Sequence, residues 1–283
     1  MPDALLVAGG ALIIVAIGVD IAITLLHPAA RGPLSYAVNR SAWGAVAGLS
    51  RGPRSLSYAG PVAMLANMLM WVFGLWLGHA LVYASAMDFG DALYTSGEAI
   101  STVGFGNVTF DPEWLRYVAV LQAAGGFGVF TAAIAYVLSV YPLVTQIRAA
   151  ALFADAVADS GDGGDASVLT RRLIESHEHV KRFPVLYYFE SGDDSESMAT
   201  LLKSAVTACL RLRDAGDQRR ADGLQRALER LFDDLESEFI GGRAGARGRG
   251  RSEGESFVER ADQVIAAFAR EHRQEYDGLP SVR

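Results

Sequence analysis

A short loop between two apolar segments carries the most distinctive chemistry of this sequence. Residues 102–106 read Thr-Val-Gly-Phe-Gly. Glycine at the alternate positions 104 and 106 permits backbone angles that other residues resist. Successive carbonyl groups can then point toward one axis, and several such loops around that axis could replace the water shell of a dehydrated cation. The loop therefore predicts cation coordination by backbone oxygens.

The residues before this loop predict a short helix that is aimed at it. Residues 91–101 can form such a helix, with Asp91 at its start. Its C-terminal end would face the loop, where the negative end of the helix dipole favours a cation. Asp88, Asp111 and Glu113 also flank the loop. If the loop were repeated around an axis, these acids would concentrate cations at its mouth.

Three apolar segments predict the membrane helices that must hold the loop. About half of the residues are apolar (51%) and a fifth are charged (20%). No charged residue lies in 55–87 or 117–147, and Asp20 alone interrupts the run 4–26. Runs of roughly 20 apolar residues can span a bilayer. Residues 87–116 then connect the second span to the third and must return to the side they came from.

The loop between the first two spans predicts the orientation of the chain in the plasma membrane. It has no acid from residue 28 to residue 87, and short basic loops stay in the cytoplasm. The N-terminus is therefore expected outside and the C-terminal half in the cytoplasm. The basic residues of this loop are Arg31, Arg40, Arg51 and Arg54.

The same loop contains an apolar stripe at helical spacing in residues 34–49. This pattern predicts a short helix in the membrane interface, with an ordinary loop as the alternative. Asp20 lies near the cytoplasmic end of the first span, where an ionisable residue is costly and usually faces protein or water. We expect it to pair with an arginine of the basic loop and to fix that helix. A proton-sensing role with His27 is the alternative.

Residues 102–106 resemble the selectivity-filter signature of potassium channels, and residues 92–96 (Ala-Leu-Tyr-Thr-Ser) resemble the pore helix that precedes it. The order of span, pore helix, filter and span also matches, over roughly residues 58–147. Residues 20–28 look like those of a bacterial group of single-pore channel proteins with an extra first span. The resemblance implies a homotetramer, because one chain supplies a quarter of the pore. It implies K⁺ bound by the filter residues Thr102, Val103, Gly104 and Phe105, with Gly106 completing the filter.

Two filter positions depart from the commonest potassium-channel pattern. Phe105 stands where tyrosine is usual, and Asn107 stands where aspartate is usual. In the resembling family, an acid at the position of Glu98 packs behind the filter and bonds to the residue just outside it, here Asn107. We expect this contact to tune how long the filter conducts, with a solvated acid as the alternative. Ser101, directly before the filter, is also assigned to its support.

The third span, residues 112–147, is longer than a bilayer core requires and should extend into the cytoplasm. Gly125, Gly126 and Gly128 lie where resembling inner helices carry a hinge glycine. Pro142 removes a helix hydrogen bond further along. These residues could bend the helix for gating or let spans pack closely. We favour the hinge for the glycines and leave both readings open for Pro142.

The sequence divides into three predicted regions. Residues 1–57 hold the first span and the basic segment, residues 58–148 the pore domain, and residues 149–283 a helical cytoplasmic domain. The apolar spacing in the last region predicts amphipathic helices, and its glycine-rich residues 241–255 predict a flexible linker. Asp193 and its acidic neighbours predict a helix start, with a calcium site as the alternative.

The expected fold is thus an all-α membrane protein: an outer helix, pore helix, filter and inner helix, with an extra N-terminal membrane helix and a cytoplasmic helical domain. No catalytic constellation or nucleotide fingerprint occurs, so we expect neither an enzyme nor a cofactor other than the permeating K⁺. The net charge of −7 argues against nucleic acid as a partner. We predict a potassium-selective channel. A weakly selective cation channel and a non-conducting membrane sensor are the alternatives, and the sequence identifies no cytoplasmic ligand.

Overall fold

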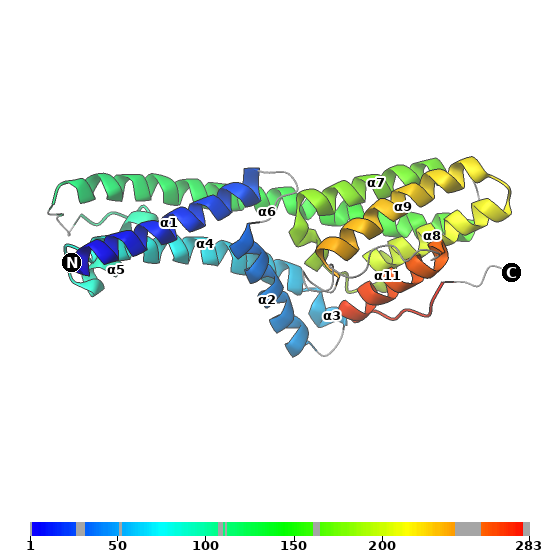
Figure 1. The fold of residues 1–283 in the computed structure, drawn as a ribbon, viewed down its shortest axis with the longest axis horizontal. Helices are drawn as coiled ribbons and strands as arrows, with labels where there is room; N and C mark the ends of the chain where they lie inside the picture. The colour runs from blue at the N-terminus through cyan, green and yellow to red at the C-terminus, as the bar shows by residue number, and fades with distance from the viewer. Residues whose placement is uncertain are drawn as a thin grey trace. The chain divides into compact units, whose positions relative to one another are not determined.

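The computed structural model describes residues 2–26, 32–50, 53–106, 110, 112–160, 165–240 and 256–279, and within these ranges it contains no strand. The all-α fold expected for this membrane protein is confirmed. His27, Arg31, Arg51 and the predicted linker 241–255 lie outside the described residues. The helices (Figure 1) are α1 (Pro2–Leu26), α2 (Pro33–Leu49), α3 (Pro53–Leu56), α4 (Ala59–Tyr83), α5 (Phe89–Ile100), α6 (Trp114–Ser160), α7 (Ala166–Arg182), the 3₁₀ helices η2 (Pro184–Tyr188) and η3 (Asp194–Glu196), α8 (Met198–Asp214), α9 (Gln218–Glu238) and α11 (Phe257–Glu271).

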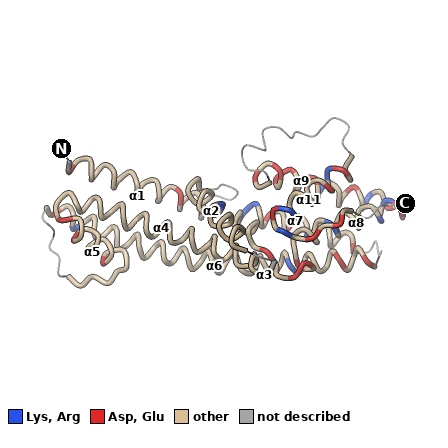
Figure 2. The backbone as a smooth tube through the Cα atoms, turned by 90° about the horizontal axis from the view of Figure 1, so that it is seen from below, with Lys and Arg blue, Asp and Glu red and all other residues tan. Residues whose placement is uncertain are grey.

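Three of these helices are long and apolar enough to cross a membrane. They are Asp3–Leu26, Ala59–Tyr83 and Trp114–Asp159. Charged residues are sparse along α1 and α4 and gather on the helices that follow α6 (Figure 2). The third helix continues well beyond residue 147, where the charge-free run ends, because the alanine-rich sequence after Arg148 favours the helix.

Contacts divide the chain into two compact units. The first comprises residues 1–42 and 62–139, and the second comprises residues 43–61 and 140–283. The helices α2, α4 and α6 each contribute residues to both units. The functional regions inferred from the sequence, with borders near residues 57 and 148, stay predictions.

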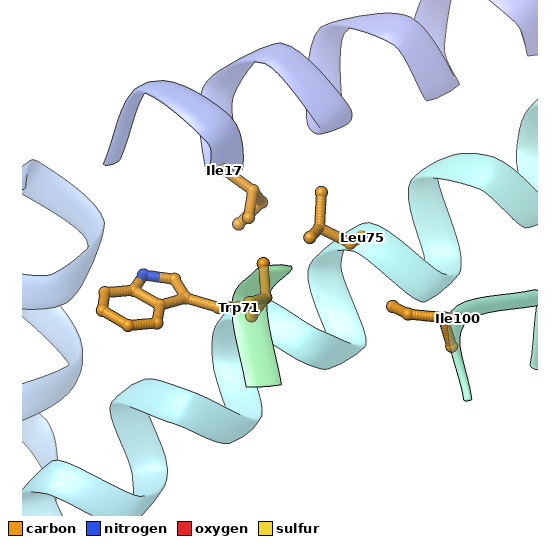
Figure 3. Packing of buried hydrophobic residues seen from close by; sticks show 5 residues of the cluster. Ile17, Trp71, Leu75 and Ile100 are labelled. Atoms are coloured by element: carbon orange, nitrogen blue, oxygen red, sulfur yellow. The ribbon is translucent and has the colours of Figure 1, made fainter. Parts of the chain in front are cut away.

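An apolar cluster in the first unit joins four helices. Ile17 of α1, Trp71 and Leu75 of α4, Ile100 of α5 and Val129 of α6 are all buried in it. Figure 3 shows the side chains of Ile17 and Leu75 reaching toward each other from α1 and α4. Membrane helices associate through close packing more than through the hydrophobic effect. The packing of Ile100 in this cluster therefore fixes the position of the C-terminal end of α5.

Asp20 contacts groups that the sequence did not predict, and the pairing with Arg31 or Arg51 lies outside the described residues. Its buried carboxylate accepts hydrogen bonds from the backbone N–H groups of Leu34 (2.8 Å) and Ser35 (3.2 Å). The Ser35 hydroxyl and the Trp71 indole N–H (3.0 Å) donate to it as well. Among the described residues its partners are therefore the first turn of α2 and a side chain of α4. A carboxylate at a helix N-terminus satisfies free N–H groups and complements the helix dipole.

The second unit contains the helices predicted for the C-terminal half. Their apolar faces are buried as the periodicity predicts, and His177 of α7 bonds Asp234 of α9 at 2.7 Å. The acidic segment expected to begin a helix forms η3, with Asp193 as its cap, whereas the following α8 is capped by Ser197. The buried apolar residues include Leu169, Leu173, Leu202, Val206, Leu224, Leu228, Leu231, Val264, Ile265 and Phe268.

Two ionisable side chains are buried in the core of the second unit. His272 is 1% exposed and Glu190 is 4% exposed, and the imidazole Nε2 lies 3.4 Å from the Glu190 Oε1. Burial lowers the pKa of His272 from 6.5 to about 4. Burial, with a smaller contribution from the negative charge of Asp194, raises the pKa of Glu190 well above its ordinary 4.5. His272 is therefore neutral near pH 6, and burial favours the protonated form of Glu190.

We expect the buried carboxyl of Glu190 to make the second unit less stable as the pH rises above its ordinary pKa of 4.5. Above that pH the unfolded carboxyl loses its proton, whereas the folded carboxyl, whose pKa is raised, keeps its proton to a higher pH. The contribution of Glu190 to the free energy of unfolding then falls with rising pH, by up to roughly 1.4 kcal/mol per unit. His272, whose pKa is lowered, contributes the opposite slope below 6.5, so the effect of Glu190 is measured as a difference between variants.

The substitution Glu190→Gln removes this titration. In full-length protein, the urea midpoint of the wild type should fall relative to that of Glu190→Gln as the pH rises from 4.5. The exposed neighbour Glu275 provides the control, since Glu275→Gln should keep the wild-type slope. Parallel pH profiles for the wild type and Glu190→Gln would show that Glu190 is already ionised in the folded protein.

Candidate functional site

The loop after α5 has an alternating backbone conformation. Thr102, Gly104 and Gly106 have φ angles of 58°, 57° and 72°, whereas Val103 and Phe105 between them have negative φ. A left-handed conformation is free of strain for glycine but costs other residues roughly 1–2 kcal/mol, so Thr102 must be held in it. Alternation of the two conformations allows successive carbonyls to point to one side, which an ordinary strand does not.

Glu98 of α5 fixes this loop from behind. Its carboxylate oxygen Oε1 accepts a hydrogen bond from the backbone N–H of Phe105 at 3.0 Å. Its backbone carbonyl accepts from the N–H of Val103 at 3.1 Å. The residue is 9% exposed, so little of it is open to solvent. Asn107, the partner expected from the sequence, lies outside the described residues.

Ser101 caps the C-terminal end of α5. Its hydroxyl donates to the carbonyl of Gly97 at 2.6 Å, and its N–H bonds the same carbonyl at 3.1 Å. The next N–H, of Thr102, donates to the carbonyl of Ala99 at 3.1 Å. These hydrogen bonds continue from the end of α5 to Thr102, the first left-handed residue of the loop.

The start of α5 differs by two residues from the expected position. The helix begins at Phe89, and the side chain of Asp88 caps it by accepting from the N–H of Gly90 at 3.0 Å. Asp91, expected at the start, lies in the first turn, where an acid still complements the helix dipole. Asp88, Asp91 and Glu113 are all exposed, whereas Asp111 lies outside the described residues.

A buried polar network ties α5 to α4 and α6. The Ser96 hydroxyl donates to the carbonyl of Trp76 at 2.7 Å, and the Trp76 indole donates to the carbonyl of Leu93 at 2.9 Å. The Gln122 amide donates to the hydroxyl of Ser96 at 2.8 Å and to its carbonyl at 3.0 Å. The Tyr83 hydroxyl donates to the Gln122 oxygen at 2.7 Å. Hydrogen bonds in a low dielectric are strong and directional, so this network sets the position of α5.

Gly126 supports the loop through close packing. A Cβ at this position would overlap the backbone carbonyl of Ile100, with the carbonyl carbon and Cα at 3.1 Å. The inner helix therefore touches the last residue of α5 at a point where only glycine fits. Gly125 and Gly128 have no atom within 4 Å of a Cβ, so they remain the hinge candidates. Pro142 lies inside the continuous helix α6.

The sequence located the loop and Glu98 but missed the network around Ser96. One signal was available, since Gln122 is an amide within the charge-free run 117–147, and polar side chains inside a membrane usually mark a partner. Among the described residues, no group of three or more His, Cys, Asp or Glu could hold a metal ion.

Comparison with known proteins agrees with the geometry. Residues 68–141 match the sequence profile of a family described as ion channel. An uncharacterized membrane protein of Bacillus subtilis (strain 168), YdjJ, is 23% identical over 205 residues, which cover 62% of this chain and 59% of that protein. No solved structure matches the chain significantly. The family match begins within α4, includes α5 and the loop that follows it, and ends within α6.

We expect Gly126→Ala to destabilise the first unit, because its Cβ would displace the carbonyl of Ile100. Overpacking of this kind costs about 1–3 kcal/mol. Gly125→Ala on the same helix is the matched control, since its Cβ meets open space and alanine favours a helix interior by about 1 kcal/mol. Thermal melts in detergent should give a lower midpoint for Gly126→Ala only. Equal midpoints for the two variants would remove the packing role.

Proposed function

We propose that this chain is one subunit of a homotetrameric potassium-selective channel of the plasma membrane. The observation that carries the proposal is the alternation of left-handed residues at Thr102, Gly104 and Gly106. The loop that contains them follows a short helix and lies between two helices long enough to span a membrane. This combination supplies a series of main-chain oxygens on an element that protein side chains hold in place.

In the proposed channel, K⁺ exchanges its hydration shell for carbonyl oxygens of Thr102, Val103, Gly104 and Phe105, with Gly106 closing the filter. One chain offers one such row, so four rows around an axis are needed to surround an ion. The exposed side chains of Val103 (53%) and Phe105 (70%) leave surface for neighbouring subunits. The exposed large apolar residues of α6 provide further surface for neighbours or lipid: Tyr117, Val120, Leu121, Phe127, Phe130, Ile134 and Leu138.

The inner helix is the proposed gate. Gly125 and Gly128 lack neighbours that would resist a bend, whereas Gly126 is committed to its contact with Ile100. Pro142 cannot donate the backbone hydrogen bond of its turn, so the helix is also weaker there. Bending at either point would change the width of the pore below the filter. The proposed orientation has the N-terminus outside and the C-terminal half in the cytoplasm.

Two other functions are alternatives to the proposed one. A weakly selective cation channel would use the same loop with a less exact spacing of oxygens. A non-conducting membrane sensor would keep the pore fold and transmit through the helices of the second unit. The weakly selective channel differs from the proposed channel in its ion preference, and the sensor differs in having no ion flux. Both properties can be measured directly.

Ion flux from purified protein in liposomes tests the proposed function. We expect K⁺ flux well above that of empty vesicles, and reversal potentials in K⁺/Na⁺ mixtures that follow K⁺. Gly104→Ala should abolish the flux, because alanine resists a φ of 57°. Gly18→Ala in α1, where a Cβ meets nothing within 4 Å, is the control. Background flux would favour the sensor, and equal permeability to both ions would favour the weakly selective channel.

Single-channel recording tests the role of Glu98. Glu98→Ala leaves the N–H of Phe105 without its acceptor, a loss of roughly 1.5–3 kcal/mol for a bond to a charged group. We expect its conductive periods to shorten by at least about tenfold. Glu98→Gln keeps an acceptor oxygen and should lie between Glu98→Ala and the wild type. Unchanged durations in Glu98→Ala would show that the filter does not depend on this bond.

A further inference from the structure

A basic pocket lies between α6 and α7 within the second unit. Its volume is about 370 Å³, which is within the range of roughly 300–1,000 Å³ typical of small-molecule sites. Gln146 and Ala150 of α6 line one side, and α7 lines the other. The polar side chains contributed by α7 are Arg171, Arg172, Glu175, Ser176 and His179.

Two side-chain nitrogens at this pocket are buried without a hydrogen-bond partner in the described part of the chain. They are Nε of Arg172 and Nδ1 of His179. The two residues are seven positions apart on α7, so they share one face of the helix. An unsatisfied buried polar group costs folding free energy, and the great majority of such groups have a partner. A ligand in the pocket could satisfy both nitrogens.

The chemistry of these nitrogens restricts the ligand. Arginine only donates hydrogen bonds, so the partner of Arg172 must be an acceptor. The guanidinium is also held in place, with its central carbon 5.0 Å above the ring centre of Phe153. A fixed, planar donor with an adjacent second arginine suits phosphate oxygens.

The charges around the pocket favour an anion. Arg171 and Arg172 contribute two positive charges against the one negative charge of Glu175. Burial lowers the pKa of His179, and the positive charge of Arg182 lowers it further. The negative charges of Glu175 and Glu178 raise this pKa, but by less than burial lowers it. His179 is therefore neutral at neutral pH and can either donate to or accept from the ligand.

We propose that the pocket between α6 and α7 binds the phosphate group of an organic phosphate, held by Arg172, Arg171 and His179. The volume exceeds what inorganic phosphate alone would fill, so an attached group such as glycerol or a nucleoside fits the remainder. The phosphate can come from a soluble ester or from a phospholipid headgroup. Binding does not depend on the proposed channel function, so it is measured directly and not through ion flux.

Equilibrium titration of the purified full-length protein in detergent tests this site. The probes are glycerol 3-phosphate, adenosine 5′-monophosphate and short-chain phosphatidylglycerol, with short-chain phosphatidylcholine for comparison. We expect saturable binding of at least one of the first three. Binding of the two soluble esters would identify a soluble ligand, whereas binding of phosphatidylglycerol alone would identify a lipid headgroup.

Matched variants locate the binding. Arg172→Gln should weaken it by about 10-fold to 100-fold, the loss expected for a charge-assisted hydrogen bond. Arg171→Gln changes an exposed residue, so it tests the site even if Arg172→Gln fails to fold. Arg230→Gln removes one positive charge from an exposed position of α9 and should leave the affinity unchanged. Absence of binding by all three anionic probes, or an equal loss in Arg230→Gln, would overturn the proposal.

Discussion

The hydrogen bond from the N–H of Phe105 to the carboxylate of Glu98 is the interaction on which the loop depends. A chain in which every second residue is left-handed makes no regular hydrogen bonds of its own. Its backbone N–H groups need partners behind it if its carbonyls are to stay free for an ion. Glu98 supplies two of them, through its side chain to Phe105 and through its carbonyl to Val103.

Other contacts in the first unit position Glu98. The short helix α5 carries it, and that helix is fixed by hydrogen bonds at Ser96 and by close packing of Ile100 on Gly126. The apolar cluster around Trp71 completes the support. A loop whose conformation costs free energy needs such redundancy, because strained segments persist only where the surroundings determine them.

The first and second units share the helices α2, α4 and α6. Asp20 bonds the first turn of α2 and Trp71 in the first unit. Trp43, later in α2, lies against His272 in the second unit, with tilted rings whose centroids are 4.8 Å apart. The helix α6 likewise carries Gly126 beside the loop and Gln146 at the basic pocket. The helices α2 and α6 therefore each have contacts in both units.

Much of the fold was predictable because its signals are local in the sequence. The charge-free runs predicted the membrane helices, the alternate glycines predicted the strained loop, and the leucine spacing predicted α9. The partners of Asp20 were not predictable, since hydrophobicity and charge give no indication that a carboxylate will meet backbone N–H groups and an indole. The packing role of Gly126 could not be distinguished from a hinge role by sequence alone. A glycine that bends a helix and a glycine that makes room for a neighbouring carbonyl give the same sequence pattern.

The central claim is that main-chain oxygens from identical loops surround a dehydrated cation. An experimental structure of the assembled protein in a lipid bilayer with K⁺ would test it most directly. We expect four subunits around one axis, with ion density between the carbonyl oxygens of Thr102, Val103, Gly104 and Phe105. Carbonyls of Val103 and Phe105 that turn away from a shared axis, or a different number of subunits, would contradict it.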